Sequence, residues 1–187
     1  MWNFLVLAML FSVAGYYAMT DQKQVAATQT AQIQLTLAGD MAIYRQAVID
    51  YYRANPGAPL NGAVSTPVLS AYFPGWSNTA ELSAQWSNWI DGNGTIYVYS
   101  QVPLPTNIIS SIVSLSQNSI LAGEAVMQGG QLVLYAPADI PTAPPSTMGS
   151  SSGLPYASDY GPHGALALPP AAAIPAGSPV WLATSAN

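Results

Sequence analysis

The sequence predicts an α+β fold, in which a long N-terminal helix leads into a small antiparallel β-sheet. Residues 21–54 contain no proline and carry apolar side chains at helical spacing, which predicts an amphipathic helix. After residue 56, short apolar runs alternate with Gly, Pro, Asn and Asp, which is typical of strands joined by tight turns. A helix that packs on such a sheet gives a two-layer domain.

The composition favours a protein that lies against other proteins. Charged residues make up 6% of the 187 residues, against about 25% in an ordinary soluble domain. The only cations are Lys23, Arg45 and Arg53, and the net charge is −5. A phosphate-binding surface cannot be built from three scattered cations, so no nucleic-acid partner is expected. The chain has no cysteine, which excludes disulfides and cysteine-ligated metals.

Residues 1–19 are predicted to form a transmembrane anchor. They read MWNFLVLAMLFSVAGYYAM and contain no ionisable side chain. A helix of this length spans about 28 Å, close to the hydrocarbon thickness of a bilayer. The alternative is a cleaved signal peptide, but a basic leader is missing and Tyr16 and Tyr17 stand where small residues are expected. Lys23 alone would leave the body in the cytoplasm, whereas the polar, charge-poor body favours the other side of the membrane.

Residues 20–56 are predicted to form an amphipathic helix. Thr20 and Asp21 either cap a second helix or continue the first into one rod, and Asn55-Pro56-Gly57 ends it. One apolar stripe is expected to pack on the sheet: Ile33, Leu37, Met41, Tyr44, Val48, Tyr51 and Tyr52.

Residues 57–136 are predicted to form the antiparallel sheet domain, with one short helix. Residues 85–90 and 95–101 flank Asp91-Gly92-Asn93-Gly94, a strong hairpin signal. Residues 119–127 and 131–135 form a second hairpin, which turns at Gly129-Gly130. Between the hairpins, residues 105–117 are expected to be a helix with four inward side chains, Ile108, Ile109, Ile112 and Leu115.

The last part of the chain divides into a Pro-, Ser- and Gly-rich segment and a final strand. Residues 137–163 are predicted to be a linker or long loop. Within residues 164–187, the run 179–183 is expected to return as a strand at the edge of the sheet.

No residue pattern predicts a catalytic, metal or cofactor site or a small-molecule substrate, so we do not expect an enzyme. His163, the one histidine, lies in the loop segment, where a catalytic base would be poorly oriented. Glu81 and Asp91 could make a hydrolase pair, with Glu124 as a third member. Asp91, however, is already explained by the hairpin turn.

Aromatic residues supply the best candidates for partner binding. Trp76, Trp86 and Trp89 lie around the first hairpin, near Tyr72 and Phe73. A buried core is the ordinary explanation, and a docking surface is the alternative, because Trp and Tyr dominate binding hot spots. Strand alternation puts Ile96 and Val98 on one face and Tyr97 and Tyr99 on the other. If they face solvent, Tyr97 and Tyr99 are the first candidates for docking, followed by Trp86 and Trp89.

The order of these features resembles that of the PilM proteins of type IVb pilus operons, which differ from the actin-like PilM proteins of type IVa systems. The resemblance is carried by the charge-free start, then MAIYRQAVIDYYRANPG, GTIYVYS and LPPAAAIPAGSPVWL. It implies a single-pass inner-membrane protein with its body in the periplasm and other pilus-assembly proteins as partners. It assigns no functional residue.

The sequence therefore favours a non-enzymatic, membrane-anchored component of pilus assembly that scaffolds or docks other subunits. Two alternatives remain. A long helix on an antiparallel sheet is also a pilin-like plan, so the chain could be a structural subunit of the fibre. The carboxylates leave open an envelope hydrolase that acts on peptidoglycan.

Overall fold

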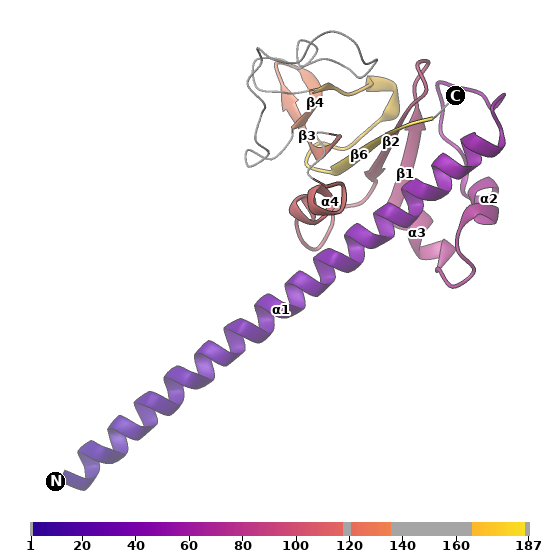
Figure 1. Cartoon of the computed structure of the whole chain (residues 1–187). Helices are drawn as coiled ribbons and strands as arrows, with labels where there is room; N and C mark the ends of the chain where they lie inside the picture. The colour runs from indigo at the N-terminus through magenta and orange to yellow at the C-terminus, as the bar shows by residue number, and fades with distance from the viewer. Residues whose placement is uncertain (1, 118–120, 136–165, 186–187) are drawn as a thin grey trace.

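A single long helix, α1 (Trp2–Ala54), runs along one side of a β-sheet domain and projects far beyond it (Figure 1). This computed structural model describes the backbone of residues 2–117, 121–135 and 166–185, and their side chains except at residues 2–23 and 171. The loop predicted for residues 137–163, with His163, lies outside the described residues.

The helix α1 passes through Thr20 and Asp21 without a break, so the second of the two expected arrangements, one continuous rod, is the one observed. It ends where the sequence predicts, at Ala54, just before Asn55 and Pro56. The side-chain amide of Asn55 donates a hydrogen bond of 2.9 Å to the carbonyl of Tyr51 and so satisfies a backbone acceptor of the last turn.

The membrane span expected at the N-terminus is not seen in the part of the chain that the structure describes. Within it, no helix is both long and apolar enough to cross a bilayer. The side chains of the expected anchor, residues 1–19, lie outside the described residues, and the anchor stays a prediction.

Six antiparallel strands form one sheet in the order β1-β2-β6-β3-β4-β5. The strands are β1 (Trp86–Ile90), β2 (Thr95–Ser100), β3 (Ala122–Gln128), β4 (Gln131–Tyr135), β5 (Leu166–Ala167) and β6 (Pro179–Thr184). Both predicted hairpins are present, because β1 pairs with β2 and β3 pairs with β4.

The final strand is not at the edge of the sheet, and that expectation is wrong. Strand β6 lies in the centre and joins the two hairpins: Leu182 pairs with Tyr97 of β2, and Trp181 pairs with Ala122 of β3. Five successive residues of β6 are buried. A strand that is apolar on both faces needs cover on both sides and neighbours at both edges, which only a central position provides.

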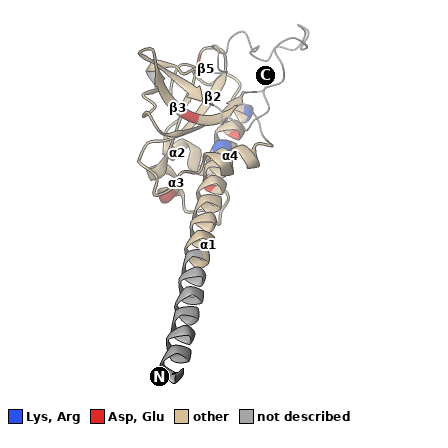
Figure 2. Cartoon of the chain, turned by 90° about the vertical axis from the view of Figure 1, so that its left-hand side faces the viewer, with Lys and Arg blue, Asp and Glu red and all other residues tan. Residues whose placement is uncertain are grey.

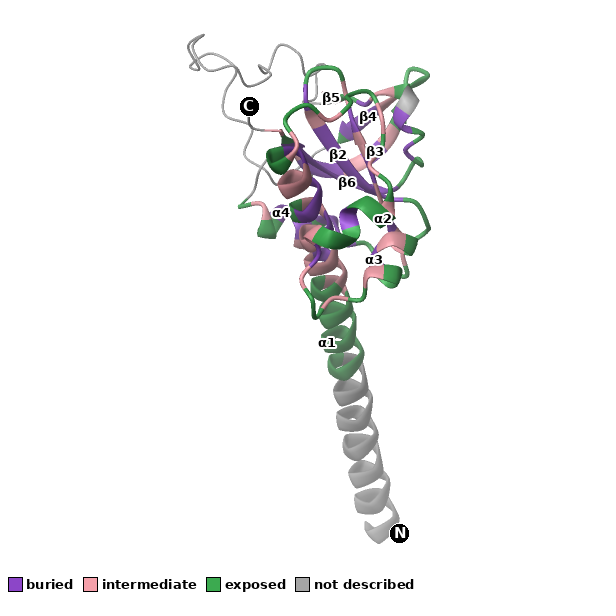
Figure 3. Ribbon diagram, turned by 90° about the vertical axis from the view of Figure 1, so that its right-hand side faces the viewer, coloured by how far each residue is buried: buried purple, intermediate pink, exposed green. Residues whose placement is uncertain are grey.

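One face of the sheet is covered by the C-terminal part of α1 (Figure 3). Met41, Tyr44 and Val48 are fully buried there, as the stripe predicts. Ile33 is exposed, contrary to the expectation, because the helix first becomes buried at Ala38.

Short helices fill the edges of this layer. The helix α4 (Ile109–Leu115) lies within the predicted segment, but Leu115 is exposed and Val113 takes the inward place. The short helices α2 (Thr66–Leu69), η1 (Ser70–Tyr72) and α3 (Thr79–Gln85) were not predicted. A signal for α3 was present, since Asn78 caps it by accepting a hydrogen bond from the backbone N–H of Glu81.

The other face of the sheet has its own core, which is closed by residues 168–174 and the short helix η2 (Pro170–Ala172). Leu168, Ala172 and Ile174 pack there on Tyr97, Tyr99, Ala125, Leu134, Val180 and Leu182. The segment is attached to the sheet by a hydrogen bond of 2.8 Å from the backbone N–H of Leu168 to the carbonyl of Leu132. The sheet is therefore buried on both faces.

Candidate functional site

The two tyrosines of β2 are buried and do not form an open docking surface. Tyr97 and Tyr99 are each 6% exposed. The hydroxyl of Tyr99 donates a hydrogen bond of 2.6 Å to the carbonyl of Ala172, and that of Tyr97 donates one of 3.1 Å to the carboxylate of Asp91. Their place on the face opposite Ile96 is as predicted, but the condition that they face solvent is not met, because residues 168–174 cover them.

The tryptophans separate rather than cluster. Trp86 is 1% exposed in the core beneath α1, and Trp89 is half-buried on the opposite face. Trp76 is 77% exposed in the loop before α3. Of the four candidates named from the sequence, only Trp89 keeps a partly open surface, and the role of all four in binding a partner stays a prediction.

The carboxylates considered for a hydrolase pair have separate local contacts. Glu81 accepts a hydrogen bond of 3.1 Å from the side-chain amide of Asn78 at the start of α3. Asp91 accepts hydrogen bonds from the backbone N–H groups of Asn93 and Thr95 at 2.9 and 2.8 Å and so holds the β1–β2 turn. Glu124 lies on β3, across from Tyr135. Among the described residues, no three metal-ligating side chains come together.

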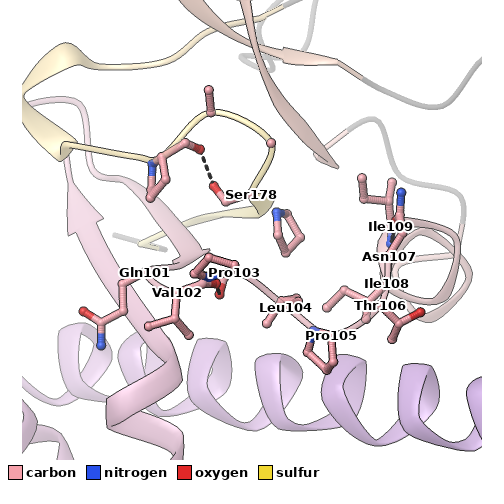
Figure 4. Close-up of a pocket in the computed structure, with 15 residues that line it drawn as sticks. Gln101, Val102, Pro103, Leu104, Pro105, Thr106, Asn107, Ile108, Ile109 and Ser178 are labelled. Atoms are coloured by element: carbon pink, nitrogen blue, oxygen red, sulfur yellow. Dashed lines mark hydrogen bonds between the residues drawn. The ribbon is translucent and has the colours of Figure 1, made fainter.

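A groove of about 480 Å³ lies between the chain after β2 and the loop before β6 (Figure 4). Its walls are residues 100–109 and 175–179, and four of these residues are prolines. None of the lining residues is ionisable, so the groove offers no acid, base or charged metal ligand.

The helix α1 supports one wall of this groove. The side-chain amide of Gln34 donates hydrogen bonds of 3.1 Å to the hydroxyl of Thr106 and 2.9 Å to the carbonyl of Asn107. Gln34 thus joins α1 to the sheet domain one turn before the helix becomes buried at Ala38.

A second hollow, of about 220 Å³, is lined in part by Arg45. It lies between α1, the end of α4 and β6, and its lining includes Leu115, Leu121 and Trp181. The Nε–H of Arg45 donates a hydrogen bond of 3.1 Å to the carbonyl of Leu182, and the guanidinium carbon lies 4.9 Å from the centre of the Trp181 ring. The side chain is therefore held in one orientation by β6.

The charge of Arg45 is unusual for its position. Charged residues are few and scattered among uncharged ones (Figure 2). In the described part of the chain, the single ion pair joins Arg53 to Asp50 at 2.9 Å, so Arg45 has no carboxylate partner there. Burial lowers the pKa of the Arg45 guanidinium, yet an arginine remains protonated at any physiological pH. From the sequence, Arg45 was noted only as one of three cations. Its position next to Tyr44 of the buried stripe was the sign that it lies beside the core.

A family model described as PilM matches residues 9–182. A crystal structure of protein PilM from Escherichia coli B7A is similar at a TM-score of 0.43 and 20% identity, over 83% of this chain and 94% of that one. That similarity is too distant to bear on function, and no curated protein matches. Because the family model covers nearly the whole sequence, the chain belongs to the PilM family.

Proposed function

We propose that this protein is a non-enzymatic, membrane-anchored component of type IVb pilus assembly, and that its sheet domain docks other subunits of the machine in the periplasm. Membership of the PilM family supports a role in pilus assembly. The charge-poor composition supports a protein whose surface is in contact with other proteins. The anchor would be residues 1–19 in the inner membrane.

The observation that carries the proposal is the continuity of α1. One helix begins at Trp2, in the charge-free segment, and ends at Ala54, against the sheet. Residues 24–33 are exposed all round, so this stretch is a bare rod between the two ends. Between the end of the expected anchor and the buried part of the helix, from residue 20 to residue 37, α1 rises about 26 Å at 1.5 Å per residue. Such a rod would hold the domain at a fixed distance from the membrane and confine it near its partners.

Two experiments test the proposal. A deletion strain should lose surface pili and recover them when the full chain is supplied, whereas normal pili in the deletion strain would refute the role. A phosphatase fused after Asn187 should be active, since this enzyme folds only outside the cytoplasm. An inactive fusion, with an active fluorescent-protein fusion at the same site, would place the body inside.

A second candidate is a pilin-like subunit of the fibre. The observation that favours it is the half-covered helix: α1 packs on the sheet from Ala38 onward, and residues 24–33 are exposed. The exposed turns between residues 24 and 33 could pack against helices of other subunits. Recovery of the protein in sheared pili would support the fibre role, and its restriction to the membrane fraction would support the scaffold.

A further inference from the structure

We propose that the hollow around Arg45 binds a carboxylate side chain, Asp or Glu, of a partner protein. The site is formed by residues of α1, the end of α4, and β6, so it belongs to the folded body. In the part of the chain that the structure describes, Arg45 has no acidic partner of its own. A half-buried cation without a counter-ion loses part of its hydration, and a carboxylate from outside would offset part of that cost.

The guanidinium is already positioned for this contact. Its Nε–H is held by the carbonyl of Leu182 and its plane lies near the ring of Trp181. Among the described hydrogen bonds, Arg45 uses only Nε, so its terminal amino groups remain available as donors, and Arg45 lines the hollow. A planar pair of N–H donors matches the two oxygens of a carboxylate. Because the side chain is fixed beforehand, little rotamer entropy is lost on binding.

The charge and the walls favour a protein carboxylate over a phosphate. One guanidinium carries a single positive charge, which neutralises one carboxylate but not a doubly charged phosphate, and the chain as a whole carries −5. Leu115, Leu121 and Trp181 contribute apolar walls, and Ser116 and Gln117 contribute uncharged polar ones. They suit an acidic residue that has an apolar neighbour in its own chain. The unexpected exposure of Leu115 is consistent with such a contact.

The test is an NMR titration of the full chain, labelled with ¹⁵N and held in detergent micelles. The probes are acetyl-Leu-Glu-methylamide and its uncharged match, acetyl-Leu-Gln-methylamide. We expect the Glu probe to shift the Arg45 Nε–H and the Trp181 indole N–H in a saturable way. We expect the Gln probe to bind at least tenfold more weakly. Equal shifts from both probes, or none, would overturn the proposal.

Variants and a second anion sharpen the test. Arg45→Met should abolish the response of the Trp181 indole, and Arg53→Met, which removes the exposed cation on the same helix, should leave it unchanged. If Arg45→Met does not fold, Arg45→Lys keeps the charge without the planar fork and should weaken binding at least fivefold; full affinity in this variant would contradict the geometry. Inorganic phosphate that shifts the same signals at lower concentration than the Glu probe would also overturn the assignment.

This inference rests on the proposed function only in requiring a protein partner. The two can fail separately. A titration without effect would leave the pilus phenotype of the deletion strain as it is. A deletion strain with normal pili would end the pilus role without changing what the purified protein binds.

Discussion

The side-chain amide of Asn88 donates a hydrogen bond of 2.9 Å to the hydroxyl of Tyr44, deep in the core, and so joins β1 to α1. The same amide donates a bond of 3.0 Å to the carbonyl of Val64 and accepts one of 2.8 Å from the backbone N–H of Val64. Asn88 is 2% exposed. One buried polar group therefore connects the helix, the edge strand and the segment beside it.

Replacement of Asn88 should be costly. Asn88→Ala leaves the N–H and the carbonyl of Val64 and the hydroxyl of Tyr44 without their partner, and we expect a loss of about 2–3 kcal/mol in the free energy of unfolding. Tyr44→Phe removes one bond only and should cost about 1 kcal/mol. Asn93→Ala, in the exposed turn, is the control. Urea unfolding followed by circular dichroism measures all three, and equal losses at Asn88 and Asn93 would contradict the role of the network.

Local features of the fold were readable from the sequence. The turn at Asp91–Gly94 fixed the first hairpin, and the alternation of Ile96 and Val98 with Tyr97 and Tyr99 gave the correct faces. Asn55 and Pro56 gave the end of α1. These features depend on interactions between residues a few places apart, so the local pattern determines them.

Features that depend on distant segments were not readable. The sequence left open whether Tyr97 and Tyr99 face solvent, because their cover comes from residues 168–174, far along the chain. The central place of β6 depends on pairing with two strands that precede it by dozens of residues. The environment of Arg45 likewise combines α1, α4 and β6. The residue pattern of a single segment does not predict contacts with segments that lie far away in the sequence.

Two glycines should respond in opposite directions to alanine. A Cβ at Gly123 would collide with the backbone carbonyl of Tyr135 on the paired strand, which cannot move aside. We expect Gly123→Ala to destabilise the fold by at least about 2 kcal/mol. At Gly39, inside α1, a Cβ meets nothing within 4 Å. Gly39→Ala should stabilise the protein by about 0.5–1 kcal/mol through helix propensity. Thermal unfolding of both variants checks the signs.

The free energy of unfolding should fall at alkaline pH, because Tyr97, which is hydrogen-bonded to Asp91 of the β1–β2 turn, keeps its proton in the folded state. Burial, followed by the charge of Asp91, raises the pKa of Tyr97 to about 12. Between pH 10 and 12 the unfolded chain loses a proton that the folded chain keeps, so stability is full below pH 10 and falls as the pH rises. Tyr97→Phe should make this fall less steep.

A comparison variant for the alkaline range is available. Burial raises the pKa of Tyr52 to about 12 as well, so Tyr97→Phe alone should leave part of the slope, and the double variant with Tyr52→Phe should leave less. Unfolding free energies at pH 9, 10 and 11 give the slopes. A slope that is unchanged in Tyr97→Phe would show that the proton of Tyr97 is not held by the fold.

The carboxyl of Asp40 should destabilise the fold when it is charged, which is the opposite of a carboxylate held in an ion pair. Burial, followed by the charge of Glu81, raises its pKa above the ordinary value. Its contribution is therefore full below about pH 4 and is lost as the pH rises through the folded-state pKa. Asp40→Asn should match the parent protein at pH 3 and exceed it at pH 7. The gain should be below about 1 kcal/mol, because the side chain is only half-buried and water screens its charge.

The matched control for Asp40 lies on the same helix. Asp50→Asn removes the exposed pair with Arg53, and we expect it to lower stability slightly at pH 7, by no more than about 0.5 kcal/mol. Opposite signs for the two variants at pH 7 are the expected result. A loss of stability in Asp40→Asn would mean that its carboxylate is stabilised in the fold rather than strained.

The exposed rod of α1 allows a direct test of whether the helix orients the domain or merely tethers it. Residues 24–30 are all exposed, and the hydrogen bonds of Thr28 and Thr30 stay within the helix. Deletion of residues 24–30 shortens the rod by about 10 Å but turns the domain by only about 20°. Deletion of residues 25–29 shortens it less, by about 7.5 Å, yet turns the domain by about 140°.

If the rod orients the domain toward fixed partners, the shorter deletion should be the more harmful one. We expect the variant that lacks residues 25–29 to lose surface pili and the variant that lacks residues 24–30 to keep them, at equal protein levels in the membrane fraction. A flexible tether would tolerate both deletions, and a strict requirement for length would make the longer deletion worse. Because the two variants differ in rotation and length in opposite orders, counts of surface pili distinguish all three cases.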